Sequence, residues 1–197
     1  MTIWSFKTLA AGVMSLALAG CETTTGGAGQ GSALPFARLA RGAVTLVPPV
    51  GYCVDKRSLR ASFALMARCD TLGGTATFGA PLALITAATV THGTESAAGA
   101  RDETILARRQ SDTLTLLQVR GTPPSADMRD VFWRAIGQVG EQVIGLAIYE
   151  PADAISLGEG APDLLAQTIR RTRRQTAAEA TIAQDKSATT SAKPALN

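Results

Sequence analysis

The stretch FWRAIGQVGEQVIGLAIYE, residues 132–150, constrains the fold more than any other part of the chain. A single helix across it would contain Gly137, Gly140 and Gly145, each of which costs about 1 kcal/mol relative to alanine. Two strands that turn near Gly140 avoid this penalty. We therefore predict an antiparallel hairpin, which Pro151 closes.

Four shorter segments also predict strands. Their apolar runs are short, rich in β-branched residues or alternate between threonine and leucine, as expected for half-buried strands. Prolines or glycines lie close to the ends of several of them. The four segments are residues 43–47, 62–69, 81–91 and 112–119.

Helices are predicted at three places, residues 95–109, 125–131 and 162–175. Ser125 suits an N-cap, and Pro162 suits a first helical turn. Strands that outnumber helices and follow one another along the chain favour an α+β class. We therefore expect a largely antiparallel sheet flanked by two or three helices.

The N-terminus has the pattern of an export signal. Lys7 precedes a short apolar run that cannot span a bilayer, which needs roughly 20 apolar residues. The run ends in Leu18-Ala19-Gly20-Cys21, which resembles the lipobox of bacterial lipoprotein precursors. The alternatives are an ordinary signal peptide with a chance cysteine, or a small buried cysteine in a helix.

The lipobox resemblance implies that residues 1–20 are a signal peptide, removed when Cys21 receives diacylglycerol. Two or three acyl chains anchor a protein stably, so the membrane is the first expected partner. Lipoproteins of this class that stay at the inner membrane often carry aspartate after the cysteine. Glu22 therefore favours the periplasmic face of the outer membrane.

Composition divides the mature chain into three parts. Residues 21–42 begin with a Gly-rich stretch and are expected to form a flexible tether. Residues 43–175 are expected to form a single domain. Residues 176–197 are rich in Ala, Thr and Ser, which predicts a low-complexity disordered tail, with a short helix left open across residues 176–184.

Cys53 and Cys69 remain after Cys21 is assigned to the anchor. An exported protein meets oxidising conditions, so this pair predicts a disulfide. A loop of about 15 residues makes such a bond worth about 3 kcal/mol. Two buried free thiols are the alternative.

No catalytic residue, metal ligand or cofactor is predicted. His92 is the single histidine, and its catalytic interpretation, as a base beside Ser96 or paired with Cys53, is weighed against an ordinary loop histidine. The acidic pairs Asp102-Glu103 and Asp127 with Asp130 lie at predicted helix starts, where carboxylates favour the helix dipole. The aromatic residues Phe132, Trp133 and Tyr149 are expected to pack in the core or on a sheet face rather than bind sugars.

Four arginines form the densest basic cluster, Arg170, Arg171, Arg173 and Arg174. A solvated helix end is the favoured interpretation of this cluster. The alternative is contact with anionic lipid or acidic glycan, because a basic residue near an anionic membrane gains about 1 kcal/mol. Nucleic acid is excluded by the expected envelope location.

The runs VTLVPPVGYCVD and FALMARCDTL, with the element order after them, resemble alphaproteobacterial envelope proteins of unassigned activity. Their layout is similar to the PsbP-like α+β sandwich over residues 43–175, and that resemblance implies an accessory or binding module. We therefore expect a non-enzymatic envelope lipoprotein that acts as an accessory or binding module, with an envelope protein as a candidate partner. A hydrolase of cell-wall or lipid material and a small-ligand carrier are the alternatives.

Overall fold

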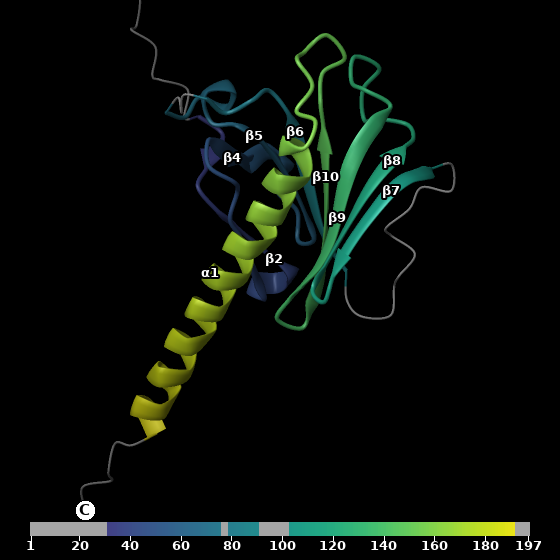
Figure 1. Ribbon diagram of the computed structural model, residues 1–197. Helices are drawn as coiled ribbons and strands as arrows, with labels where there is room; N and C mark the ends of the chain where they lie inside the picture. The colour runs from purple at the N-terminus through teal and green to yellow at the C-terminus, as the bar shows by residue number, and fades with distance from the viewer. Residues whose placement is uncertain (1–30, 76–78, 91–102, 192–197) are drawn as a thin grey trace, which may run out of the picture.

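The computed structural model describes residues 31–75, 79–90 and 103–191, with side chains as far as residue 185. Figure 1 shows a broad, twisted sheet with one long helix, α1 (Gly160–Ser191), lying obliquely across one face. The sheet has eight strands in the order β1-β4-β5-β6-β10-β9-β8-β7, and the small β2–β3 ribbon packs beside the helix. Every paired strand is antiparallel to its neighbour.

The strands are mostly connected by short turns. In chain order the strands are β1 (Ala33–Leu34), β2 (Ala37–Leu39), β3 (Val44–Leu46), β4 (Tyr52–Asp55), β5 (Phe63–Arg68), β6 (Leu84–Val90), β7 (Thr104–Ser111), β8 (Leu114–Arg120), β9 (Val131–Val139) and β10 (Gln142–Tyr149). Three single-turn 3₁₀ helices lie at Ala40–Gly42, Lys56–Ser58 and Asp70–Leu72.

The predicted hairpin is confirmed. β9 and β10 pair from Val139 with Gln142 to Trp133 with Ile148, and Gly140 occupies the turn at φ 57°. A left-handed backbone of this kind favours glycine. The four other predicted strands are confirmed as β3, β5, β6 and β8, with ends shifted by one to three residues.

The main core lies between the sheet and α1. Leu165 and Ile169 of the helix are buried among side chains such as Val139 and Ile144 of the hairpin. Gly137 permits this close approach, because a Cβ atom there would lie 3.0 Å from Ile169 Cδ1. Residues with small side chains therefore set the distance between helix and sheet.

The helix also satisfies backbone donors of β3 and of the residues after it. The amide of Thr45 donates to Thr176 Oγ1 at 3.0 Å, and that of Val47 donates to Thr172 Oγ1 at 3.1 Å. Thr172 is fully buried, and its hydroxyl removes the cost of a buried, unpaired amide. Polar residues of α1 thus hold the β2–β3 ribbon in place.

Two of the three predicted helices are corrected, so the described residues form one α-helix rather than two or three. Residues 104–109 belong to strand β7, because they pair with β8 across a tight turn, and residues 95–102 lie outside the described ranges. Residues 125–131 form turns, an isolated bridge between Met128 and Pro151, and the start of β9. In both places long-range pairing overrides local helix propensity.

The predicted tether and tail are also more structured than expected. Residues 33–39 of the tether contribute β1 and β2. The helix predicted at 162–175 is present, but it runs from Gly160 to Ser191 and so extends through much of the predicted tail. Glu179 stabilises this extension by accepting a hydrogen bond from Thr45 Oγ1 at 2.9 Å.

Candidate functional site

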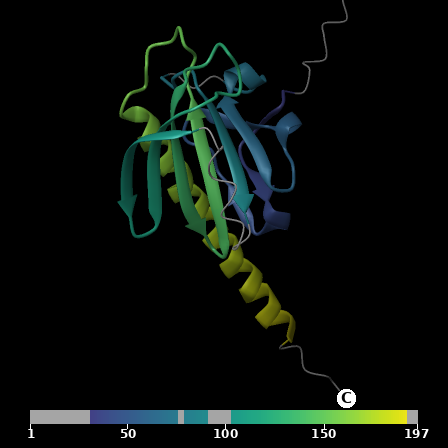
Figure 2. The same cartoon turned by 90° about the vertical axis from the view of Figure 1, so that its right-hand side faces the viewer.

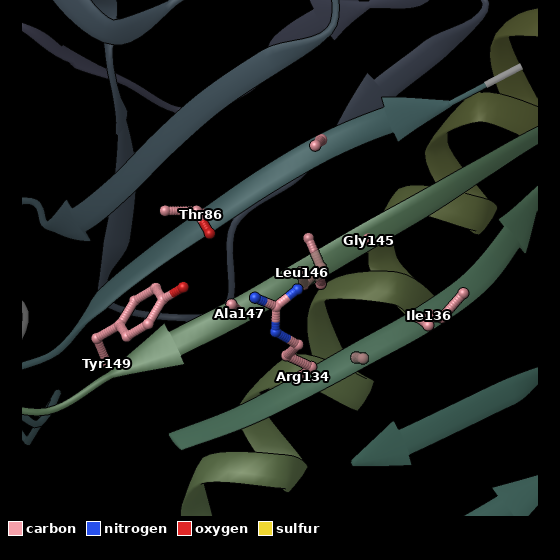
Figure 3. A pocket seen from close by; sticks show the side chains of 9 residues that line it. Thr86, Arg134, Ile136, Gly145, Leu146, Ala147 and Tyr149 are labelled. Carbon is pink, nitrogen blue, oxygen red and sulfur yellow. The ribbon is translucent and has the colours of Figure 1, made fainter. Parts of the chain in front are cut away.

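The two faces of the sheet differ. One face is covered by α1 and the β2–β3 ribbon, whereas the opposite face, here called the open face, carries a second and smaller apolar cluster. A hollow of about 150 Å³ lies on that open face over the strands β6, β10 and β9. Its lining includes Thr86, Arg134, Ile136, Gly145, Leu146, Ala147 and Tyr149, labelled in Figure 3.

Small residues create this open-face hollow. Gly145 of β10 lies opposite Ala88 of β6, and Ala147 lies opposite Thr86. A Cβ atom at Gly145 would have no neighbour closer than the Ala88 carbonyl oxygen, at 4.0 Å. The floor is therefore mostly apolar, and it has free space above the centre of the sheet.

A polar cluster closes one end of the hollow. Arg134 donates a hydrogen bond to Glu103 Oε1, and the two side chains are only 19% and 7% exposed. The Arg134 guanidinium also lies 5.5 Å from the ring centroid of Phe132. The Phe132 ring in turn contacts Tyr149, with 4.6 Å between centroids. The Arg134 guanidinium thus contacts both the Glu103 carboxylate and the ring of Phe132.

Tyr149 supplies a hydroxyl group at the same end of the hollow (Figure 3). Burial raises the pKa of Tyr149 above its ordinary value, while Arg134 lowers it, Glu103 raises it and a hydrogen bond with Thr86 lowers it. The phenol therefore stays protonated at neutral pH and serves as a hydrogen-bonding group rather than a base. Together Arg134, Thr86 and Tyr149 can bind a polar group whose apolar part rests on Ala88 and Gly145.

The volume limits what the hollow can hold. Sites for drug-sized ligands typically enclose about 300–1,000 Å³. A hollow of about 150 Å³ suits a single side chain or a comparable small group. It is thus too small for a drug-sized ligand or a large cofactor.

The predicted disulfide is confirmed. Cys53 of β4 is bonded to Cys69, which directly follows β5, with 4.8 Å between the Cα atoms. The bond fastens the loop after β5 to the neighbouring strand. Because its sulfur is oxidised, Cys53 is not available as the thiol of a cysteine–histidine pair.

The predicted carboxylate pairs are not held as catalytic dyads. Asp130 forms an ion pair with Arg120. A hydrogen bond from Ser125 lowers the pKa of Asp127, which is opposite to what a general acid needs. Glu103 lies just before β7, and Asp127 lies in a turn, so neither marks a helix start. His92, Ser96 and Asp102 lie outside the described residues.

The four clustered arginines of α1 point in different directions. Arg173 donates to the backbone oxygens of Gln138 and Thr113, which docks the helix on the β9–β10 and β7–β8 turns. Arg171 is half-buried, whereas Arg170 and Arg174 are exposed. Contact of this cluster with an anionic surface stays a prediction, carried by the latter two side chains.

The aromatic prediction is confirmed, and it leads to residues that the sequence interpretation missed. Trp133 is buried on the helix side, with the Arg109 guanidinium 5.0 Å from its ring centroid. Phe132 and Tyr149 pack on the open face. The sequence interpretation missed Arg134. Because side chains alternate along a strand, Arg134 lies on the same face as Phe132, and a charged residue within this apolar strand could have indicated the site.

No protein-family model matches the chain, and the searches of curated proteins and of solved structures likewise find no match. The PsbP-like layout therefore stays a prediction. The described residues contain no group of three side chains that could hold a metal ion. Within the same ranges, no helix is sufficiently long and apolar to cross a bilayer.

Proposed function

We propose that this protein is a lipid-anchored, non-enzymatic binding module of the bacterial envelope. In this proposal it receives a side chain of a partner protein in the open-face hollow. The observation that carries the proposal is the hollow itself, with a floor of small residues at Ala88 and Gly145 and a polar end formed by Arg134, Thr86 and Tyr149.

Two features support the envelope location, the lipobox and the disulfide. The lipobox ending at Cys21 supplies the anchor, on the periplasmic face of the outer membrane. The disulfide between Cys53 and Cys69 fits an oxidising compartment.

The size and position of the hollow favour a protein partner over a carried small molecule. A carrier needs a deep apolar pocket between sheet and helix, but residues such as Leu165, Ile169 and Ile144 are fully buried there and fill that layer. The available space lies on the other face, where no helix or strand of the described residues covers it. A partner that inserts one apolar side chain with a hydrogen-bonding end would meet both parts of the lining.

Crosslinking combined with a filled hollow tests this proposal. A photoreactive amino acid at Ile136, in the lining, is compared in producing cells with one at Arg170, on the outer side of α1. We expect a specific protein adduct from position 136 only. Adding Gly145→Val places a side chain in the free space, and we expect the adduct from position 136 to fall at least tenfold, since about 1.4 kcal/mol corresponds to a factor of ten.

A matched variant shows whether this loss is specific. Val50→Ala changes a side chain that is 59% exposed and does not line the hollow, so it leaves the adduct unchanged. Thermal melting establishes that the Gly145→Val protein is folded. An adduct that is equally strong from both crosslinker positions, or that persists in folded Gly145→Val protein, would contradict binding in the hollow.

A further inference from the structure

Charge is distributed unevenly along the domain. Residues 31–68 contain six basic residues and one acidic residue, Asp55, whereas residues 69–185 contain ten basic and fourteen acidic residues. The six are Arg38, Arg41, Lys56, Arg57, Arg60 and Arg68. The part of the domain nearest the predicted anchor is therefore strongly basic although the remainder is acidic.

The fold gathers most of these basic residues on one side. The turn between β4 and β5 carries Lys56, Arg57 and Arg60. The amide of Ala40 donates to the Ala61 carbonyl at 2.7 Å, so the β2–β3 turn, which carries Arg41, lies beside the β4–β5 turn. In Figure 2 the purple and blue segments lie together along one side of the sheet, opposite the teal strands β7 and β8.

These charges are only partly neutralised. Asp55 pairs with Arg57, Glu179 pairs with Arg38, and Asp70 pairs with Arg68. Arg60 donates to the backbone oxygens of Arg57 and Leu59, which satisfies its hydrogen bonds without compensating its charge. Together with exposed Arg41 and Lys56, it leaves a net positive surface.

The chain enters the domain at this same surface. The amide of Lys56 donates to the Ser32 carbonyl oxygen at 2.7 Å, and a hydrogen bond from the Ser32 side chain helps to lower the pKa of Asp55. Ser32 lies only eleven positions after Cys21 in the sequence. Eleven residues span at most about 40 Å, so an anchored Cys21 keeps this surface close to the bilayer.

An exposed aromatic residue lies in the same N-terminal segment as Arg38 and Arg41. Phe36 lies between β1 and β2, two residues before Arg38, and is 48% exposed. Aromatic and basic residues together are typical of surfaces that bind at the boundary of headgroups and acyl chains.

We propose that Arg41, Lys56, Arg57 and Arg60, with Phe36, form a membrane-docking surface that binds the anionic phospholipid headgroups of the membrane holding the anchor. Its placement beside the bilayer rests on the lipid anchor of the proposed function, but its affinity for anionic lipid is a property of the folded domain. Each basic residue near such a surface contributes about fivefold in affinity.

Vesicle flotation tests this surface without any acyl chain. The mature chain, residues 21–197 with Cys21→Ser, is mixed with phosphatidylcholine vesicles that either contain or lack phosphatidylglycerol. We expect binding to the anionic vesicles only, and a large reduction at about 0.5 M salt because surface charges are screened. The triple variant Arg41→Asn/Lys56→Gln/Arg60→Gln is expected to bind about 100-fold more weakly.

The matched control removes the same number of exposed charges on the opposite side of the sheet, with Arg108→Gln/Arg109→Gln/Arg120→Gln on β7 and β8, and retains most of the binding. Thermal melting shows that both variants are folded. Equal losses in the two variants, a larger loss in the control, or equal binding to neutral vesicles would overturn the proposal. Labelling of wild-type Cys21 with a palmitate analogue tests the anchor separately, so a failure of the anchor is distinguished from a failure of this surface.

Discussion

Replacing Gly137 with alanine tests how closely α1 packs on the sheet. The added Cβ would lie 3.0 Å from Ile169 Cδ1, 3.1 Å from Ile169 Cγ2 and 3.2 Å from an Arg173 guanidinium nitrogen. Overpacking a dense interior costs about 1–3 kcal/mol. Alanine recovers about 0.5–1 kcal/mol, because glycine loses more backbone entropy on folding.

The midpoints of these two ranges leave a net loss of about 1 kcal/mol in the free energy of unfolding, which lowers Tm by about 2–4 °C for a domain of this size. Gly145→Ala is the matched control, because the new methyl group there has no neighbour closer than 4.0 Å. We expect the control to raise stability by about 0.5–1 kcal/mol. Differential scanning calorimetry measures both variants.

The two glycines lie on opposite faces of the same hairpin, so they distinguish packing from general strand effects. If Gly137→Ala melts at or above the wild-type temperature, α1 does not press on β9 at this point. If Gly145→Ala destabilises as much as Gly137→Ala, the open-face hollow is not free space.

Three further predictions concern the disulfide, the helix and acid stability. The double variant Cys53→Ala/Cys69→Ala is expected to lose about 3 kcal/mol, measured by urea unfolding, because its unfolded chain is no longer constrained. Thr172→Val leaves the part-buried Val47 amide without its 3.1 Å partner, so calorimetry is expected to show a loss of about 1 kcal/mol, at the low end of the cost of an unpaired amide. The Arg57 side chain lowers the pKa of Asp55 below 3.8, so the stabilisation is intact above that value and is lost as pH falls through the folded-state pKa. Between about pH 5 and about pH 2, Asp55→Asn is therefore expected to lose less in Tm than the wild type.

The hairpin at residues 132–150 was predictable because its glycines oppose a helix and its apolar residues alternate. Strand β7 was not, since it is an edge strand that is exposed along nearly its whole length and carries no alternating apolar signal. The far part of α1 was missed for a different reason. Its Ala/Thr-rich sequence has little apolar content, and contacts such as Thr176 and Glu179 with Thr45 are made across more than 130 residues.

The candidate site shows the same division. The disulfide could be predicted from two cysteines in a chain that is itself predicted to be exported. The open-face hollow could not, because it depends on the register that places Gly145 opposite Ala88 and on the approach of Glu103 to Arg134. The excess of basic residues in 31–68 can be counted in the sequence. That they form one surface could not be predicted, because it depends on the contact between the β2–β3 and β4–β5 turns.

Mass spectrometry of the N-terminal peptide tests directly whether the domain is attached to a membrane through Cys21. The protein is isolated from membranes of its producing cells and digested, and the first peptide is identified by mass. We expect a peptide that begins at Cys21 and carries diacylglycerol on the thiol. A mature chain that still contains Leu18-Ala19-Gly20, or one with unmodified Cys21, would contradict it.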